Sequence, residues 1–396
     1  MPFSRIFLSA FVILILLSAC DQKYKNAEES ANEKPSNIPY THKLAPAETL
    51  VFDIDQETSV NNFFYDAFTL NDVEYMGLMN RNNNSLQIYS IPERSLYAKI
   101  KFDQEGPESF PKFGAFKVIS SDSILILNQY GKNLWLVDIK GNVRKKYDIK
   151  NLDGPLFSLG ITFYTGIKPL LIGDKLYIKS QSIMVDNLQL EFFEKSNKRE
   201  IEIDLKNETW KFVDVSYPSQ YQGNLWRFDI SRDLGKDGNI IYSFAIDSDL
   251  QEYNPINWTP TAHPAKSDFV GSINPMTKTE DQEEMAKYFL ETPKYTNLVY
   301  DKHRDVYYRF VSHGISTVNS VTGDRNTYDD TSFSIIILDS SFNKIGETKV
   351  EDKKYQINCY FVTEKGLFIS NANPKNAELN EDKLSFTLFA LQKTGA

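Results

Sequence analysis

Residues 114–149 read GAFKVISSDSILILNQYGKNLWLVDIKGNVRKKYDI. Four β-rich runs alternate in it with three short polar turns. The runs cover residues 115–119, 123–127, 133–139 and 143–149, and the turns cover residues 120–122, 129–132 and 140–142. Short runs rich in β-branched and aromatic residues, bounded by Gly, Asn, Asp and Ser, indicate strands joined by tight turns. The stretch therefore predicts a four-stranded antiparallel meander.

Similar four-strand units can be traced along the rest of the chain. We place them at about residues 63–102, 161–205, 223–266, 295–350 and 357–392, the last with only three clear strands. The third strands of the first three units, at residues 86–91, 134–139 and 188–194, lie about 50 residues apart. Four strands repeated at this spacing are typical of a β-propeller. A pair of β-sandwich domains would explain the strands but not the spacing.

The incomplete last unit has a candidate partner at the other end of the chain. Residues 48–54, ETLVFDI, form a lone predicted strand before the first unit. A propeller that borrows an N-terminal strand for its last blade leaves fewer exposed sheet edges. We therefore predict an all-β, six-bladed propeller of four-stranded blades, closed by this strand.

A seventh blade would require residues 267–294 to form strands, and their pattern is helical instead. Thr279 and Gln282 fit a capping box, acidic residues follow, and Pro293 comes after the predicted end. We expect a surface helix that packs on one blade. A lid over the central funnel is the functional alternative.

The N-terminus has the features of a bacterial export signal. Residues 6–17, IFLSAFVILILL, form an apolar run shorter than the about 20 residues that span a bilayer. Leu17-Ser18-Ala19-Cys20 follows and resembles a lipobox, in which the cysteine becomes the lipidated first residue. We expect a signal peptide at residues 1–19, lipidated Cys20 with a flexible tether at residues 20–43, and the propeller at residues 44–396.

Lipidation would anchor the protein in the cell envelope through its N-terminus. We expect the outer membrane, with the membrane face left open. The second of the two cysteines, Cys359, lies in a predicted strand and cannot form an internal disulfide with a lipidated partner. We expect it to be a buried, packed side chain.

Composition excludes two broad classes. With 41% hydrophobic residues among 396, the chain has enough apolar material for a large core, so global disorder is excluded. Its formal net charge is −9, so it lacks the basic surplus of a nucleic-acid-binding protein.

Three further segments carry a family resemblance: FDQEGP at residues 102–107, YDKHRDVYYRF at residues 300–310 and IIILDSSFNKIGE at residues 335–347. Together with the lipobox and the tether, they resemble domain-of-unknown-function family 4221, lipoproteins of Bacteroides-type bacteria with a six-bladed propeller-like fold. The resemblance implies a propeller and an envelope location. It implies no activity, because the family has none assigned.

The sequence contains no common motif for a metal, a cofactor or a catalytic nucleophile. The four histidines, His42, His263, His303 and His313, do not have the spacing of a zinc site. No nucleophile elbow, phosphate-binding loop or EF-hand loop occurs. We therefore expect no metal and no cofactor.

The segment from His303 to Phe310 is the richest in functional side chains. Strand alternation places Tyr307 and Arg309 on one face, where Arg309 would be partly buried and would need a carboxylate or carbonyl partner. A ligand contact at the funnel is the alternative. The candidate ligand-binding residues are His303, Arg304, Asp305, Tyr307, Arg309, Trp226 and Arg227.

Two main functions fit these observations. The first is a binding or scaffold propeller for a protein or glycan partner, which the lack of a catalytic motif favours. The second is a hydrolase or lyase acting on a polysaccharide with funnel-facing carboxylates. A sensor is a third, weaker hypothesis. Two carboxylates about 5–10 Å apart in an open pocket would favour the enzyme.

Overall fold

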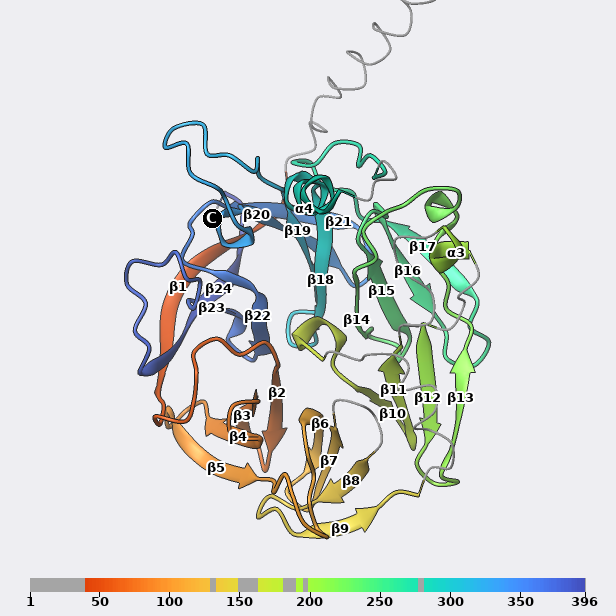
Figure 1. The fold of residues 1–396 in the computed structure, drawn as a ribbon, viewed down its shortest axis with the longest axis vertical. Helices are drawn as coiled ribbons and strands as arrows, with labels where there is room; N and C mark the ends of the chain where they lie inside the picture. The colour runs from red at the N-terminus through yellow and green to blue at the C-terminus, as the bar shows by residue number, and fades with distance from the viewer. Residues whose placement is uncertain are drawn as a thin grey trace, which may run out of the picture. The chain divides into compact units, whose positions relative to one another are not determined.

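The computed structural model describes residues 40–128, 133–148, 163–180, 190–194, 199–276 and 281–395. From Tyr40 onward the chain forms one compact unit. Its strands form six four-stranded antiparallel sheets, which surround a central axis as the blades of a propeller (Figure 1). The predicted signal peptide, Cys20 and nearly all of the predicted tether lie outside the described residues. The prediction of a six-bladed propeller is confirmed.

The first three blades follow one another along the chain, each with its first strand innermost (Figure 1). Blade 1 contains β2 (Tyr65–Leu70), β3 (Val73–Asn80), β4 (Ser85–Ser90) and β5 (Ser95–Lys101). Blade 2 contains β6 (Phe113–Ser120), β7 (Ser123–Asn128), β8 (Leu134–Val137) and β9 (Val143–Lys146). Blade 3 contains β10 (Leu170–Ile172), β11 (Lys175–Lys179), β12 (Glu200–Asp204) and β13 (Thr209–Val213).

The last three blades complete the ring. Blade 4 contains β14 (Ile230–Leu234), β15 (Ile240–Phe244), β16 (Asp249–Tyr253) and β17 (Pro260–Pro264). Blade 5 contains β18 (Lys294–Asp301), β19 (Val306–Ser312), β20 (Phe333–Asp339) and β21 (Lys344–Val350). Blade 6 contains β22 (Gln356–Thr363), β23 (Gly366–Ser370), β24 (Lys383–Lys393) and the N-terminal strand β1 (His42–Asp53).

The N-terminal strand closes the ring, as predicted. β1 pairs antiparallel with β24 from His42–Lys393 to Asp53–Lys383, and so forms the outermost strand of blade 6. It begins six residues before the predicted strand at 48–54, so His42 and Lys43, assigned to the tether, are part of the sheet. This pairing ties the two ends of the chain together and covers the edge of β24.

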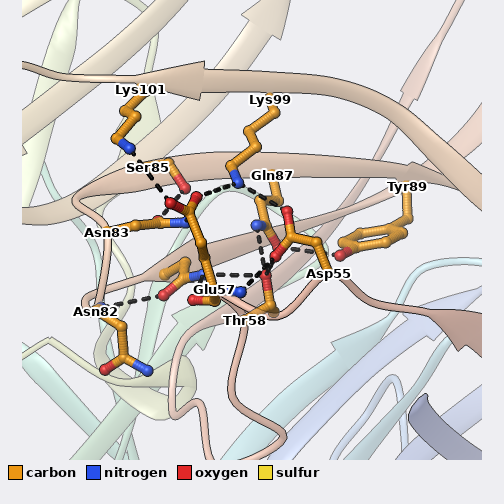
Figure 2. Close-up of polar contacts among 11 residues, drawn as sticks. Asp55, Glu57, Thr58, Asn82, Asn83, Ser85, Gln87, Tyr89, Lys99 and Lys101 are labelled. Carbon is orange, nitrogen blue, oxygen red and sulfur yellow. Dashed lines mark hydrogen bonds and ion pairs between the residues drawn. The ribbon is translucent and has the colours of Figure 1, made fainter. Parts of the chain in front are cut away.

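The connection from β1 to β2 is fastened to blade 1 by a polar network (Figure 2). The buried Thr58 hydroxyl donates to Asp55 Oδ1 at 2.6 Å and accepts from Gln87 Nε2 at 2.7 Å and Asn80 Nδ2 at 3.1 Å. At the surface, Lys99 Nζ lies 2.7 Å from Asp55 Oδ2 and 2.8 Å from Glu57 Oε2. The network therefore holds the ring-closing segment against blade 1.

The predicted third strand of blade 3, at residues 188–194, was wrong. The short helix α3 (Glu191–Glu194) lies there, and β12 is the third strand. Phe192 and Phe193 are both buried against Tyr217. Adjacent residues in a strand point to opposite faces, so a helical turn suits two neighbouring rings that contact one ring.

The predicted helix before blade 5 is present as α4 (Gln282–Glu291). Its N-cap is Asp281, whose side chain accepts from the Glu283 backbone N–H. The predicted capping residue Thr279 lies outside the described residues. Met285 and Tyr288 pack against the core that blades 3 and 4 share. No helix within the described ranges is long and apolar enough to cross a bilayer.

Candidate functional site

The two faces of the propeller differ in what they offer a ligand. We call the face where the innermost strands begin the proximal face, and the face where they end the distal face. The short helix η2 (Thr165–Ile167) packs against the innermost strands β14, β18 and β22, and the Thr165 backbone N–H donates to the Phe63 carbonyl at 2.9 Å. Cavities open on both sides of it.

Two adjoining cavities lie at the proximal side, and we call them together the proximal groove. Their volumes are about 250 and 320 Å³, close to the lower limit of the range of about 300–1,000 Å³ that is common for ligand sites. They share Phe63, Lys294, Thr296 and Asn358. One extends over blades 1, 3 and 4 and the other over the β19–β20 loop, so the groove runs outward from the axis.

The electrostatic centre of the proximal groove is Asp229, just before β14. Its carboxylate lies 3.2 Å from Arg227 Nε and 3.4 Å from Lys294 Nζ. Burial opposes ionisation of Asp229, but Lys294 and Arg227 outweigh it and hold the pKa of this carboxyl well below its usual value. The Asp229 side chain is 32% exposed and the Lys294 side chain 20% exposed. The Asp229–Lys294 ion pair is therefore charged and accessible to solvent.

The walls of the groove combine aromatic rings with amides and hydroxyls. Phe63 is 46% exposed and Tyr328 is 59% exposed. Asn297 Nδ2 donates to Asn358 Oδ1 at 3.0 Å and to the Ile357 carbonyl at 3.2 Å. Exposed rings beside fixed amides provide both apolar and hydrogen-bonding contacts.

The distal side has a cavity of about 190 Å³ that is lined by a charge network. Asp66 Oδ2 lies 3.3 Å from Lys117 Nζ, and Asp66 Oδ1 lies 3.0 Å from Lys168 Nζ. Lys168 Nζ is also 3.7 Å from Asp233 Oδ1. One ammonium thus bridges two carboxylates of different blades, and both carboxylates line this cavity.

Asp66 and Lys168 stabilise each other's charged forms. Burial opposes ionisation of Asp66, but the lysines outweigh it and lower the pKa of Asp66. Burial also opposes the charge of Lys168, yet Asp233 and Asp66 raise its pKa above the usual value. A glycosidase general acid needs a carboxyl whose pKa is raised. Asp66 has the opposite shift.

Of the candidate residues, two line a cavity. His303 lines the distal cavity, and Arg227 lines the outer part of the proximal groove. Arg227 also donates to the Phe289 carbonyl of α4, and its guanidinium lies 5.0 Å from the Phe289 ring centroid. Trp226 is buried in the core, with its ring centroid 6.3 Å from that of Tyr221.

Three other candidates join turns of neighbouring blades on the distal face. Arg304 donates to the carbonyls of Thr363, at 3.3 Å, and Glu364, at 2.5 Å, in blade 6. Asp305 Oδ2 lies 2.5 Å from Lys236 Nζ of blade 4, and the Tyr307 hydroxyl accepts from the Lys236 backbone N–H at 3.1 Å. These contacts hold blades 4, 5 and 6 together.

Arg309 is completely buried between blades 4 and 5. It donates to the carbonyls of Asp247, at 2.6 Å, and Ser248, at 2.7 Å, and to Ser243 Oγ at 2.9 Å. Its guanidinium carbon lies 3.7 Å from the Tyr295 ring centroid. The expectation was partial burial with a carboxylate or carbonyl partner; the arginine is instead completely buried, and its partners include carbonyls. It lines none of the cavities described above.

Sequence reasoning missed the residues that do line the cavities: Phe63, Arg81, Asp229, Lys294, Asn297 and Asn358 on the proximal side, and Asp66, Lys117, Lys168 and Asp233 on the distal side. The sequence signal that could have found them was a charged or amide residue on the first strand of a predicted blade. Using this signal requires knowing which strand of each blade comes first.

Two further expectations concern single groups. Cys359 is buried, as predicted, and its Sγ lies 3.0 Å from the Asn62 carbonyl. Among the residues that the structure describes, no group of three or more His, Cys, Asp and Glu side chains is arranged to hold a metal ion.

The most informative similarity to a solved structure is with a DUF4221 family member from Bacteroides vulgatus. The TM-score is 0.78 at 23% identity, over 89% of this chain and 99% of that chain. A candidate exported protein from Bacteroides fragilis gives 0.48 at 9% identity, over 91% and 98% of the two chains. Virginiamycin B lyase from Staphylococcus aureus gives 0.40 at 10% identity, over 86% and 99%. The last two similarities are too weak to bear on function.

The sequence comparisons agree with the similarity to the Bacteroides vulgatus protein. Comparison with curated proteins found no match. The family described as "Domain of unknown function (DUF4221)" matches residues 41–349, which covers most of the propeller and all of the segments quoted for the resemblance. With this match and the shared six-bladed fold, the chain belongs to the DUF4221 family.

Proposed function

We propose that this protein is a binding propeller of the bacterial cell envelope, which holds a ligand in the proximal groove without transforming it. The observation that carries the proposal is the groove itself. It joins two cavities through Phe63, Lys294, Thr296 and Asn358, so one ligand can contact several blades at once. A surface of this kind suits recognition of an extended ligand.

The enzymatic alternative has weaker support. The carboxylates that would act as acid and base are Asp66 and Asp233, and Lys168 lies between them. A lysine that neutralises both carboxylates, together with the lowered pKa of Asp66, opposes proton transfer. The proximal carboxylate Asp229 is likewise held ionised by its cationic neighbours.

The envelope location rests on the N-terminal sequence. The apolar run at residues 6–17 and the lipobox-like Leu17-Ser18-Ala19-Cys20 support export followed by lipidation of Cys20. Mass spectrometry of the N-terminal peptide should find a diacylglyceryl group on Cys20. Cys20→Ala should move the protein from the membrane fraction to the soluble fraction, and an unchanged membrane fraction would contradict the anchor.

The binding function is tested by measuring binding and turnover on the same ligands. The purified protein is applied to an array of envelope and dietary glycans, and each bound glycan is then checked for new reducing ends and unsaturated products. Binding that Phe63→Ala weakens, without product, is the expected result. Product formation that disappears in Asp66→Asn or Asp233→Asn would establish the enzyme instead.

A further inference from the structure

The proximal groove has a surplus of positive charge on an acidic protein. Among the described residues that line it, Arg81, Arg227 and Lys294 are cationic, whereas Asp229 and Asp329 are anionic. The whole chain has a net charge of −9. A local excess of cations in a concave site attracts anions.

The cations of the groove are not fully neutralised by the protein. Asp229 is shared by Arg227 and Lys294, and it also interacts with Lys179. Burial and the nearby Arg227 lower the pKa of Lys294, against the opposing effect of Asp229. A bound anionic group would stabilise the charged form of Lys294.

The groove also offers contacts that an anion alone would not use. The rings of Phe63 and Tyr328 are exposed, and the side chains of Thr296, Ser312, Ser332 and Asn358 line the same space. A sugar ring has an apolar C–H face that can stack on an aromatic ring, and hydroxyls that can bond to amides and hydroxyls. A peptide backbone has no such apolar face.

We infer that the ligand of the proximal groove is a carboxylated glycan, whose sugar rings contact Phe63 and Tyr328 and whose carboxylate lies beside Lys294 and Arg227. This inference rests on the proposed binding function and names its ligand class. The carboxylate would occupy the cationic side of the groove next to Asp229, and the hydroxyls would contact Thr296 and Asn358.

Calorimetric titration of the lipidated protein in detergent tests the inference with three probes. They are oligogalacturonate, maltohexaose as a neutral glycan, and oligoglutamate with the same charge as the oligogalacturonate. We expect oligogalacturonate to bind at least about tenfold more tightly than the other two. Its affinity should fall as salt is raised, because the charged contacts are partly exposed.

Matched variants locate the site. Lys294→Gln should weaken oligogalacturonate binding by about tenfold or more, and Lys294→Arg should retain most of it. Phe63→Ala should weaken it as well. The control is Lys302→Gln, which removes an exposed lysine that lines the distal cavity and should leave affinity unchanged. Circular dichroism and thermal unfolding check that each variant remains folded.

Each other outcome overturns a defined part of the account. Maltohexaose could bind as tightly as oligogalacturonate, with binding that Phe63→Ala weakens and Lys294→Gln does not. That result would refute the carboxylate contact and leave the proposed binding function intact. If oligoglutamate bound as tightly as oligogalacturonate and Phe63→Ala did not weaken its binding, the ligand would be an acidic protein segment instead of a glycan. Loss of binding in Lys302→Gln alone would transfer the site to the distal cavity and refute the groove. Absence of oligogalacturonate binding would refute the ligand class.

Discussion

At the scale of single residues, the molecule uses its strongest polar contacts to join blades. Arg232 of blade 4 and Glu200 of blade 3 form a completely buried pair, with Nε–Oε2 and Nη2–Oε1 distances of 2.7 Å. The Tyr242 hydroxyl donates to the same carboxylate at 3.0 Å. Arg309 plays the corresponding part between blades 4 and 5 through carbonyls.

The buried pair gives the first prediction. Glu200→Gln would leave the Arg232 guanidinium charged and uncompensated in the interior, which should lower the free energy of unfolding by about 3–5 kcal/mol. Urea denaturation measures the loss. The control is Glu351→Gln, whose 71%-exposed carboxylate pairs with Lys349 and should contribute less than about 1 kcal/mol. Similar losses of unfolding free energy in the two variants would contradict the claim that burial makes the Arg232–Glu200 pair important for stability.

A second prediction concerns the contact between η2 and β18. A Cβ on Gly166 would lie 2.5 Å from Asn297 Oδ1 and 3.0 Å from Tyr164 Cε2, and both residues line the proximal groove. Gly166→Ala should therefore displace Asn297 and cost about 1–3 kcal/mol of stability. Gly271→Ala, with open space around the new Cβ, is the control and should cost little. Thermal unfolding of both variants distinguishes this contact from a general effect of alanine.

At the scale of elements, the sequence predicted strands better than it predicted their order within one blade. The meander of residues 114–149 was recognisable because polar turns separate short β-rich runs. Blade 3 was misassigned because the apolar residues around Phe192 and Phe193 resemble a strand, while their helical turn depends on tertiary contacts with Tyr217. The groove could not be predicted for the same reason, because Asp229 and Lys294 lie far apart in sequence and meet only through tertiary contacts.

The connection from β1 to β2 gives the third prediction. Thr58→Val would remove the hydroxyl that accepts from Asn80 and Gln87, which are both buried, and would leave amide donors unsatisfied. We expect a loss of about 1–3 kcal/mol in urea denaturation. Thr69→Val, at an exposed position of β2, is the matched control. If the two variants were equally stable, the polar network of Figure 2 would not fasten the ring closure.

At the scale of the whole molecule, the ring is closed by the pairing of β1 with β24, and cavities lie on both sides of η2. The distal side contains a balanced charge network, whereas the residues that line the proximal groove include one more cation than anion and two exposed rings. Most candidate residues taken from the sequence lie between blades, where they support the ring. The proposed binding site therefore lies on the side to which only Arg227 among these candidates belongs.

The burial of Lys179 has a consequence for the pH dependence of stability, which is the fourth prediction. The pKa of Lys179 is lowered to about 8 in the folded protein, below the 10.5 of an unburied lysine. Between these values the unfolded chain binds the extra proton, so this lysine makes stability rise with pH. Urea midpoints at pH 7 and pH 9 should therefore differ more in the wild type than in Lys179→Met. An identical difference in both proteins would contradict the lowered pKa.

The most direct test of the central claim is amide hydrogen exchange of the lipidated protein with and without oligogalacturonate. With oligogalacturonate bound, we expect the amides of five proximal segments to exchange more slowly: residues 61–65, 163–167, 226–229, 294–297 and 356–358. The amides of the distal turn at residues 302–305 should exchange at an unchanged rate. Slower exchange confined to the distal turn and its neighbours, or no change anywhere, would contradict a carboxylated glycan bound in the proximal groove.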